Sequence, residues 1–164
     1  MKTVLCVALA SAMACPAAAQ ENGLSPKQIG EIFCLGRLSN DMAPVLAITS
    51  PLLATTIAHA QARNDVVQRA APDEKPPLGD GIPWQSYPDH ATQCTVGNPV
   101  SSATMTGIEI DYGFPDSPEA NFTDTLVLVP VSVQAGFEPF LRIDDVVYET
   151  GGTLVELLGS SFER

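Results

Sequence analysis

The chain has 164 residues, 45% of them hydrophobic, and its 19 acidic residues against eight basic ones give a net charge of −11 at pH 7. This length and composition suit one domain with a sizeable core. The charge argues against nucleic acid and anionic membrane surfaces as partners. It permits a basic protein partner, although solubility alone is the simpler explanation of the acidity.

The first residues are typical of a bacterial signal peptide. Lys2 makes the start positive, residues 3–15 form an apolar run too short to span a bilayer, and Ala17-Ala18-Ala19 gives the small-x-small pattern for cleavage before Gln20. We therefore expect a signal peptide at 1–19 and a periplasmic or secreted domain at 20–164. The alternative is a lipid anchor at Cys15, for which Ala12 is smaller than the residue that such signals prefer at that position.

Cleavage would leave two of the four cysteines, Cys34 and Cys94. An even pair in an oxidising compartment usually forms a disulfide. The bond would close a loop of about 60 residues and contribute roughly 4 kcal/mol in the chain-entropy description. Two buried free thiols are the alternative. We predict no metal site here, because neither cysteine has a second Cys or a His at ligand spacing.

The part from 25 to 70 is expected to be helical. Ser25-Pro26 with Gln28 predicts a capping box and a proline in the first helical position, for a helix that ends near residue 39. Ser50-Pro51 repeats the cap-then-proline signal and opens a longer helix, 51–70. The buried stripe of this second helix is predicted to consist of Leu53, Ile57, Ala60, Asn64 and Val67.

A proline-rich crossover loop, 71–91, separates the helices from the strands. Its five prolines prevent a helix or a central strand from running through it. Trp84 and Tyr87 are apolar enough to hold it against the body of the domain. Long loops in small domains are often functional, so we take Trp84 and Tyr87 as candidate ligand-binding residues. The alternative is a purely structural crossover with Trp84 as its plug.

From residue 92 to 164 the pattern is that of a sheet with a closing helix. We expect strands at 92–96, 100–112, 123–134 and 140–148. Ile108, Ile110 and Tyr112 would face the core, with Glu109 and Asp111 on the opposite side. The apolar run from 126 to 133 must be central or covered on both faces, and its proline, Pro130, indicates a bulge or a bend.

The last strand, RIDDVVY, carries two aspartates among apolar residues. Alternation places Asp145 between Ile143 and Val147, which makes it the best single candidate for a functional carboxylate. Arg142 would pair with Asp144 on the other face. A bulge at the two aspartates, with both pointing outward, is the alternative. Gly151, Gly152 and Thr153 then predict the start of a short helix.

The layout and one motif resemble a known fold. LRIDDVVY at 141–148, followed by GGTLVELL at 151–158, resembles exported bacterial proteins of unknown function with the cone-shaped domain of the nuclear transport factor and ketosteroid isomerase type, close to cystatin-like folds. In those proteins a tryptophan-containing strand ending in Arg-Ile-Asp-Asp-Ile is typical, and Phe140-Leu141 stands here where the tryptophan is expected. The resemblance covers 123–158. It implies an α+β fold: N-terminal helices packed on a curved antiparallel sheet of about four strands, with a short C-terminal helix.

Such a resemblance implies little about function, because this fold hosts enzymes and binders alike. The first expectation is an exported, non-catalytic binding or interaction module of unknown ligand, one version of which neutralises a basic protein partner. The second is a small acid–base enzyme, isomerase- or hydrolase-like, that uses Asp145 with Tyr112 or Tyr148. We favour the first and predict no cofactor, because no Gly-x-Ser-x-Gly, P-loop or His-Glu-x-x-His motif is present.

Overall fold

A computed structural model of the chain describes residues 23–132 and 138–163. The expected signal peptide, the alternative anchor at Cys15 and the end of the strand expected at 123–134 lie outside these residues. The fold is α+β, as predicted, with three helices, five strands and a closing helix. The helices are α1 (Pro26–Ser39), α2 (Ala43–Leu46), α3 (Pro51–Ala70) and α4 (Leu154–Ser160). The strands are β1 (Gln93–Val96), β2 (Val100–Ser101), β3 (Thr106–Gly113), β4 (Phe122–Val131) and β5 (Phe140–Val147).

Local capping chemistry sets the helix starts. The Ser25 hydroxyl accepts from the Gln28 amide at 3.3 Å, while the Gln28 side chain accepts from the Ser25 amide at 2.8 Å, which is the predicted capping box. The Ser50 hydroxyl accepts from the Leu53 amide at 3.1 Å at the start of α3. Both long helices therefore begin where the sequence predicted.

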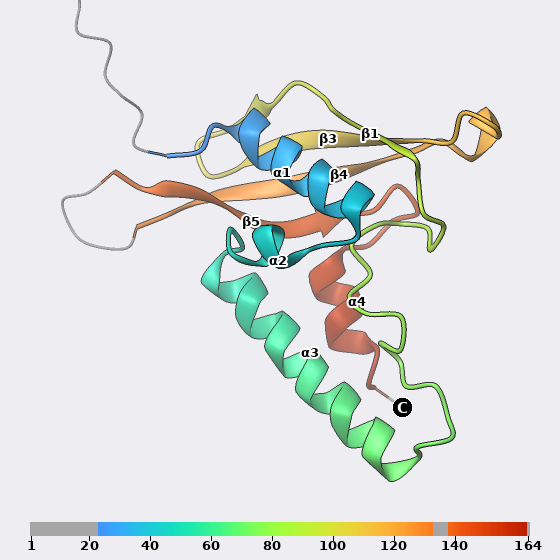
Figure 1. Ribbon diagram of the computed structural model, residues 1–164. Coiled ribbons are helices and arrows are strands. Elements are labelled where there is room, and N and C mark those ends of the chain that lie inside the picture. Colours follow the sequence, from blue (N-terminus) through green and yellow to red (C-terminus); the bar gives the residue numbers. More distant parts are fainter. Residues whose placement is uncertain (1–22, 133–137, 164) are drawn as a thin grey trace, which may run out of the picture.

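α3 packs against the body of the domain only as far as Asn64, whose side chain is half-buried and accepts from the Leu78 amide at 2.8 Å. Leu53, Ile57 and Ala60 are buried as predicted, whereas Val67 is 38% exposed. Figure 1 shows the reason: α3 runs away from the sheet, with α4 beside its middle, so its far end has no sheet to cover. The apolar stripe predicted over the whole of α3 is wrong at that end.

The antiparallel sheet has the order β1-β3-β4-β5, and the short β2 pairs with β3. The single strand predicted over 100–112 is in fact two strands, β2 and β3, joined by a turn. In this turn the Ser102 hydroxyl accepts from the amides of Thr104 and Met105, at 3.4 and 3.3 Å. Such a local hydrogen bond favours a turn over extended backbone, so the sheet has five strands instead of about four.

Burial along the central strands confirms the predicted alternation. On β3, Ile108, Ile110 and Tyr112 are buried while Glu109 and Asp111 are exposed. β4 lies between β3 and β5, as its apolar run predicted. Its core face is buried and its opposite face is half-buried, so only one face is fully covered.

The bulge lies in β5 and not at Pro130. Pro130 pairs in register with Leu141, whereas Val127 pairs with Asp145 and Leu128 with Ile143, which leaves Asp144 as the extra residue. The bulge shifts the alternation, so Ile143 and Val146, three positions apart, both reach the core. The two alternating faces predicted for this strand are therefore wrong beyond Ile143, whereas the alternative, a bulge at the two aspartates, is confirmed.

The described residues hold no ion pair between Arg142 and Asp144. Arg142 lies instead over the Phe140 ring, at 5.8 Å from its centroid.

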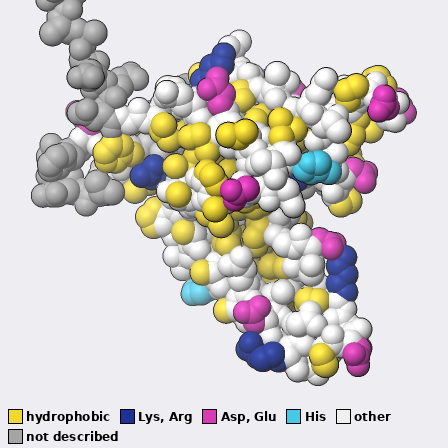
Figure 2. All heavy atoms as spheres, in the orientation of Figure 1, with side chains coloured by type: hydrophobic (Ala, Val, Ile, Leu, Met, Phe, Trp, Pro, Cys, Tyr) yellow, Lys and Arg dark blue, Asp and Glu magenta, His cyan; other side chains and the backbone are white. Residues whose placement is uncertain are grey.

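On the face seen in Figure 2, hydrophobic side chains gather over α1 and α2. Among the large apolar side chains of α1 and α2, Leu35 has the largest exposed fraction, 67%, and Leu38 and Leu46 are also exposed. In the opposite direction α1 buries Ile29 and Phe33 against the sheet. α1 thus belongs to the core through one face only. Within the described parts of the chain, no helix is long and apolar enough to cross a membrane.

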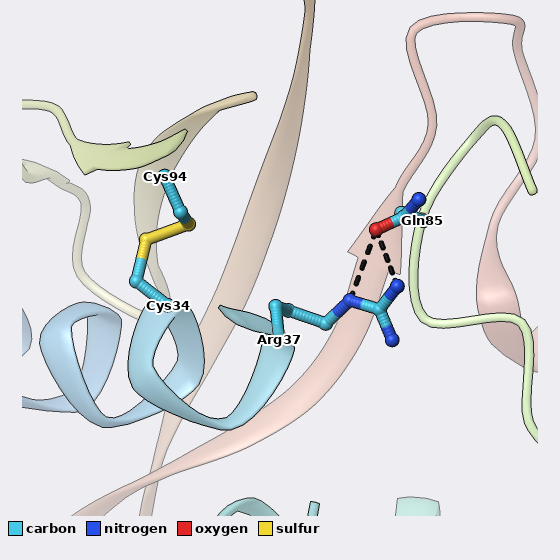
Figure 3. The surroundings of a disulfide bond; sticks show 4 residues. All are labelled: Cys34, Arg37, Gln85 and Cys94. Atoms are coloured by element: carbon cyan, nitrogen blue, oxygen red, sulfur yellow. Dashed lines mark hydrogen bonds between the residues drawn. A yellow bond between two sulfur atoms is a disulfide. The ribbon is translucent and has the colours of Figure 1, made fainter. Parts of the chain in front are cut away.

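The predicted disulfide is confirmed. Cys34 and Cys94 are bonded, with 5.4 Å between their Cα atoms, and join α1 to β1 across 60 positions of sequence (Figure 3). Cys34 is buried in the core. The bond therefore fixes the helical half of the chain to the first strand of the sheet.

Reduction of this disulfide should lower the free energy of unfolding by about 4 kcal/mol, because the unfolded chain regains the entropy of a 60-residue loop. Urea unfolding with and without dithiothreitol measures the difference. The double variant C34A/C94A serves as the control and should give the same low stability in both conditions. A wild-type midpoint that does not move on verified reduction would contradict the expectation.

Candidate functional site

A cavity of about 450 Å³ lies between the end of α1, the crossover loop and the turn from β5 into α4. In Figure 1 the crossover loop runs from the far end of α3 back along α4 to the sheet. The cavity is lined by charged, polar and aromatic side chains, among them Arg37, Trp84, Gln85, Tyr87, His90 and Tyr148. Its volume is in the range of small-molecule sites.

Asp124 is the buried charge beside this cavity. It lies on the core face of β4 and is 1% exposed. Its carboxylate accepts from the Ser86 amide at 2.9 Å, from the Ser86 hydroxyl and from the Glu149 amide at 3.1 Å. A buried carboxylate is tolerated only when such donors replace water. Asp124 therefore ties the crossover loop and the end of β5 to the central strand.

Gln85 ties the same loop to α1. Its amide group donates to the carbonyls of Tyr87 and Asp89, at 2.6 and 2.7 Å, which fixes the shape of the loop. Its carbonyl oxygen accepts from Arg37, from Nε at 3.0 Å and from Nη2 (Figure 3). Burial lowers the pKa of the Arg37 guanidinium, while the nearby Asp124 charge opposes that effect. Arg37 is thus a half-buried cation held by a neutral partner.

Two tyrosines flank Asp124 and differ in their hydrogen bonds. The Tyr148 hydroxyl donates to the Pro83 carbonyl of the crossover loop. Tyr112 is 2% exposed, and its hydroxyl has no partner among the described residues. Burial, and next the charge of Asp124, raise the pKa of both phenols far above the ordinary value of 10.0. Both tyrosines are therefore held neutral in the folded chain.

Both aromatic residues predicted to bind ligand line the cavity. The Trp84 ring is buried edge-on against Phe33 of α1, with 6.2 Å between the centroids. Tyr87 packs edge-on against Phe122 of β4 at 5.0 Å and stays 43% exposed. Trp84 is thus the plug of the loop, as the structural alternative predicted, while Tyr87 has the accessible ring.

Asp145 does not line the cavity. Its Oδ1 accepts from the Val155 amide in the first turn of α4, at 3.0 Å, and from the Val146 amide at 2.8 Å. Thr153 caps the same helix in a capping box with Glu156. A carboxylate at a helix start satisfies free amides and complements the helix dipole. The structure therefore gives Asp145 a structural role. Besides burial, its charge contributes to the raised pKa of Tyr148, but among the described residues no hydrogen bond joins Asp145 to Tyr112 or Tyr148.

Ser86 and His90 both line the cavity, but they form no catalytic triad with Asp124. The Ser86 hydroxyl donates directly to Asp124, and within the described ranges no hydrogen bond links His90 to either of them. A triad needs the histidine between the nucleophile and the carboxylate. Nor do three potential metal-ligating side chains gather anywhere in those ranges.

The sequence interpretation missed Asp124, Arg37 and Gln85. A signal for Asp124 was present, because Phe122, Asp124, Leu126 and Leu128 alternate on one face of an apolar strand. The same reasoning was applied to Asp145, where the bulge makes it fail. For Arg37 and Gln85 we find no sequence signal, since they meet across 48 positions of chain.

Replacing Asp124 by alanine should destabilise the domain by about 3 kcal/mol, because three donors lose a buried acceptor. D111A is the matched control. Among the described residues this exposed carboxylate on the neighbouring strand accepts from the Thr123 hydroxyl alone, and its loss should cost about 0.5 kcal/mol or less. Urea unfolding measures both variants. Equal losses would show that Asp124 is not the anchor of the loop.

The two tyrosines provide a matched pair. Y148F loses the bond to Pro83 and should destabilise the domain by about 1 kcal/mol, whereas Y112F removes an unpartnered hydroxyl and should cost nothing or stabilise it.

The raised pKa values of the two tyrosines also predict a pH dependence of stability: the unfolded chain loses these protons near pH 10.0 and the folded chain does not. Stability should therefore be constant below that pH and fall above it.

Urea midpoints between pH 8 and 11 test this dependence, and the fall should be smaller in each variant than in the wild type. If the urea midpoint of the wild type instead increases as the pH is raised above 10, the assignment of both tyrosines as neutral buried groups is contradicted.

Comparison with known proteins adds no relative. No protein-family model matches the chain, and neither a curated protein nor a solved structure matches it significantly. The resemblance to the nuclear transport factor and ketosteroid isomerase type therefore stays a prediction. Function has to be argued from the cavity and the residues around it.

Proposed function

We propose that the chain is an exported, non-catalytic binding module that takes a ligand into the cavity beneath its crossover loop. The observation that carries this proposal is the cavity itself, whose loop wall is held from two sides, by Asp124 of β4 and by Arg37 of α1. A wall fixed in this way needs little further ordering when a ligand arrives. Preorganisation of this kind increases affinity.

Binding is favoured over catalysis because the buried carboxylate Asp124, the candidate base Asp145 and the Tyr148 hydroxyl are already engaged in hydrogen bonds. The Asp124 oxygens accept three hydrogen bonds, the Asp145 Oδ1 accepts two, and Tyr148 donates to a backbone carbonyl. A general base needs a free lone pair toward the substrate. The proposed resemblance is compatible with this role, since the fold it implies also hosts binders.

Export is part of the proposal for two reasons. The N-terminal sequence is typical of a signal peptide. A disulfide between Cys34 and Cys94 is typical of proteins that fold in an oxidising compartment. The periplasm is the compartment we propose.

The test is a fragment screen by 1H-15N NMR on the oxidised chain, with a variant whose cavity is filled. Small aromatic fragments should shift the amides of Gln85, Tyr87 and Gly151, which line the cavity, in a saturable manner. T150W places a large side chain at an exposed lining position and should abolish these shifts.

T104W, in the exposed turn between β2 and β3, is the matched control and should leave the shifts unchanged. If no fragment shifts the cavity amides, or if T150W binds as well as T104W, the cavity is not the binding site.

A further inference from the structure

Arg37 is the one feature of the cavity that points to a particular ligand chemistry. A guanidinium has five N–H donors, and two of its nitrogens, Nε and Nη2, donate to the same oxygen of Gln85. Figure 3 shows the third nitrogen, Nη1, with no bond to the residues drawn. In residues 23–132 and 138–163 the only ion pair is Lys75–Asp80, so Arg37 has no carboxylate partner there.

This arrangement leaves a cation partly out of water beside a cavity. Arg37 is half-buried, and burial lowers its pKa, which reflects lost hydration of the charge. The Gln85 oxygen restores hydrogen bonds but supplies no negative charge. A charge in this condition gains more from an anionic partner than an exposed arginine does, and the paired N–H groups of a guanidinium match the shape of a carboxylate or a phosphate.

The other charges near the cavity support a single negative charge on the ligand. Asp124 lies close enough to favour the charged form of Arg37, yet it is buried and its oxygens point to Ser86 and Glu149. Asp80 lines the cavity but is paired with Lys75. The imidazole of His90 also lines the cavity. The net charge of −11 opposes polyanions such as nucleotides.

Part of the wall suits an apolar body, while polar side chains such as Asn40, Ser86 and Thr150 line the rest. Tyr87 presents a partly exposed ring, and Pro77, Pro83, Pro88 and Leu157 add aliphatic surface. Sites of this kind combine mostly apolar walls with few polar groups that fix the orientation of the ligand. A volume of about 450 Å³ accommodates one ring with a short acid side chain.

We propose that the cavity binds a small monocarboxylate with an aromatic or aliphatic body, its carboxylate on the outer N–H groups of Arg37. This inference rests on the binding function proposed above and adds the class of ligand. A free acid and the C-terminal carboxylate of a peptide share this chemistry.

The test compares three probes with one body: 3-phenylpropionate, 3-phenylpropionamide and 3-phenylpropylamine. In NMR titrations of the wild-type chain at pH 7, the acid should bind at least about tenfold more tightly than the amide, and the amine should bind more weakly than the amide. The affinity of the acid alone should fall as salt is raised. The tripeptide N-acetyl-Ala-Ala-Phe then distinguishes the two sources of the carboxylate. If it binds more tightly than the acid, the ligand is a peptide C-terminus; if it binds more weakly, the ligand is a free acid.

Two variants separate the charge of Arg37 from its role in holding the loop. R37Q removes the cation and should abolish the preference for the acid over the amide. Q85L breaks the same link between α1 and the loop, together with the Gln85 bonds to the Tyr87 and Asp89 carbonyls, but it keeps the cation. The preference for the acid over the amide should therefore persist even if all three probes bind more weakly.

The outcomes also separate this inference from the proposed function. If the amide or the amine matches the acid while shifting the same cavity amides, the carboxylate inference is overturned and the binding module stands. If none of the three probes shifts those amides at millimolar concentration, both are overturned.

Discussion

The structure depends on the burial of one carboxylate, that of Asp124 on the central strand. A carboxylate that is 1% exposed destabilises the fold by several kcal/mol unless donors surround it. Two of its three donors belong to Ser86, in a segment without regular secondary structure, and the third is the Glu149 amide. The core of the sheet is therefore complete only when the crossover loop is in place, which makes a loop of five prolines part of the folded core.

The second constraint acts on α1, which is fixed at two points one turn apart. Cys34 bonds it covalently to β1, and Arg37 hydrogen-bonds to Gln85 in the loop. Trp84 adds an edge-on contact with Phe33 from the same loop. The loop is thus held between the helix and the sheet. Because side chains supply the hydrogen bonds that helices and strands obtain from their own backbones, the loop keeps one shape and the cavity beside it is preformed.

Sequence reasoning succeeded where the determinants are local. The cap at Ser25 with Gln28, the alternation of β3 and the cysteine pair depend on a few neighbouring residues or on a single pairing choice, and each is confirmed. It failed where another strand decides. Alternation along the last strand left two alternatives open, an inward Asp145 or a bulge at the two aspartates, and only the register against β4 decides for the bulge; the buried Asp124 was not considered. The turn at Ser102 was missed although its cause is local, because the strand pattern of the surrounding residues indicated one continuous strand over 100–112.

The same electrostatics links the fold to the ligand class. An acidic chain has many carboxylates, yet those nearest the cavity are turned to structural donors: Asp124 to the loop, Asp145 to α4 and Asp80 to Lys75. The ionised group left facing the cavity without a counter-charge is Arg37. A guanidinium stays protonated even when burial lowers its pKa, and no carboxylate forms an ion pair with Arg37 among the described residues. A single carboxylate on an apolar body supplies the missing partner, whereas a more highly charged anion meets the repulsion of the whole chain.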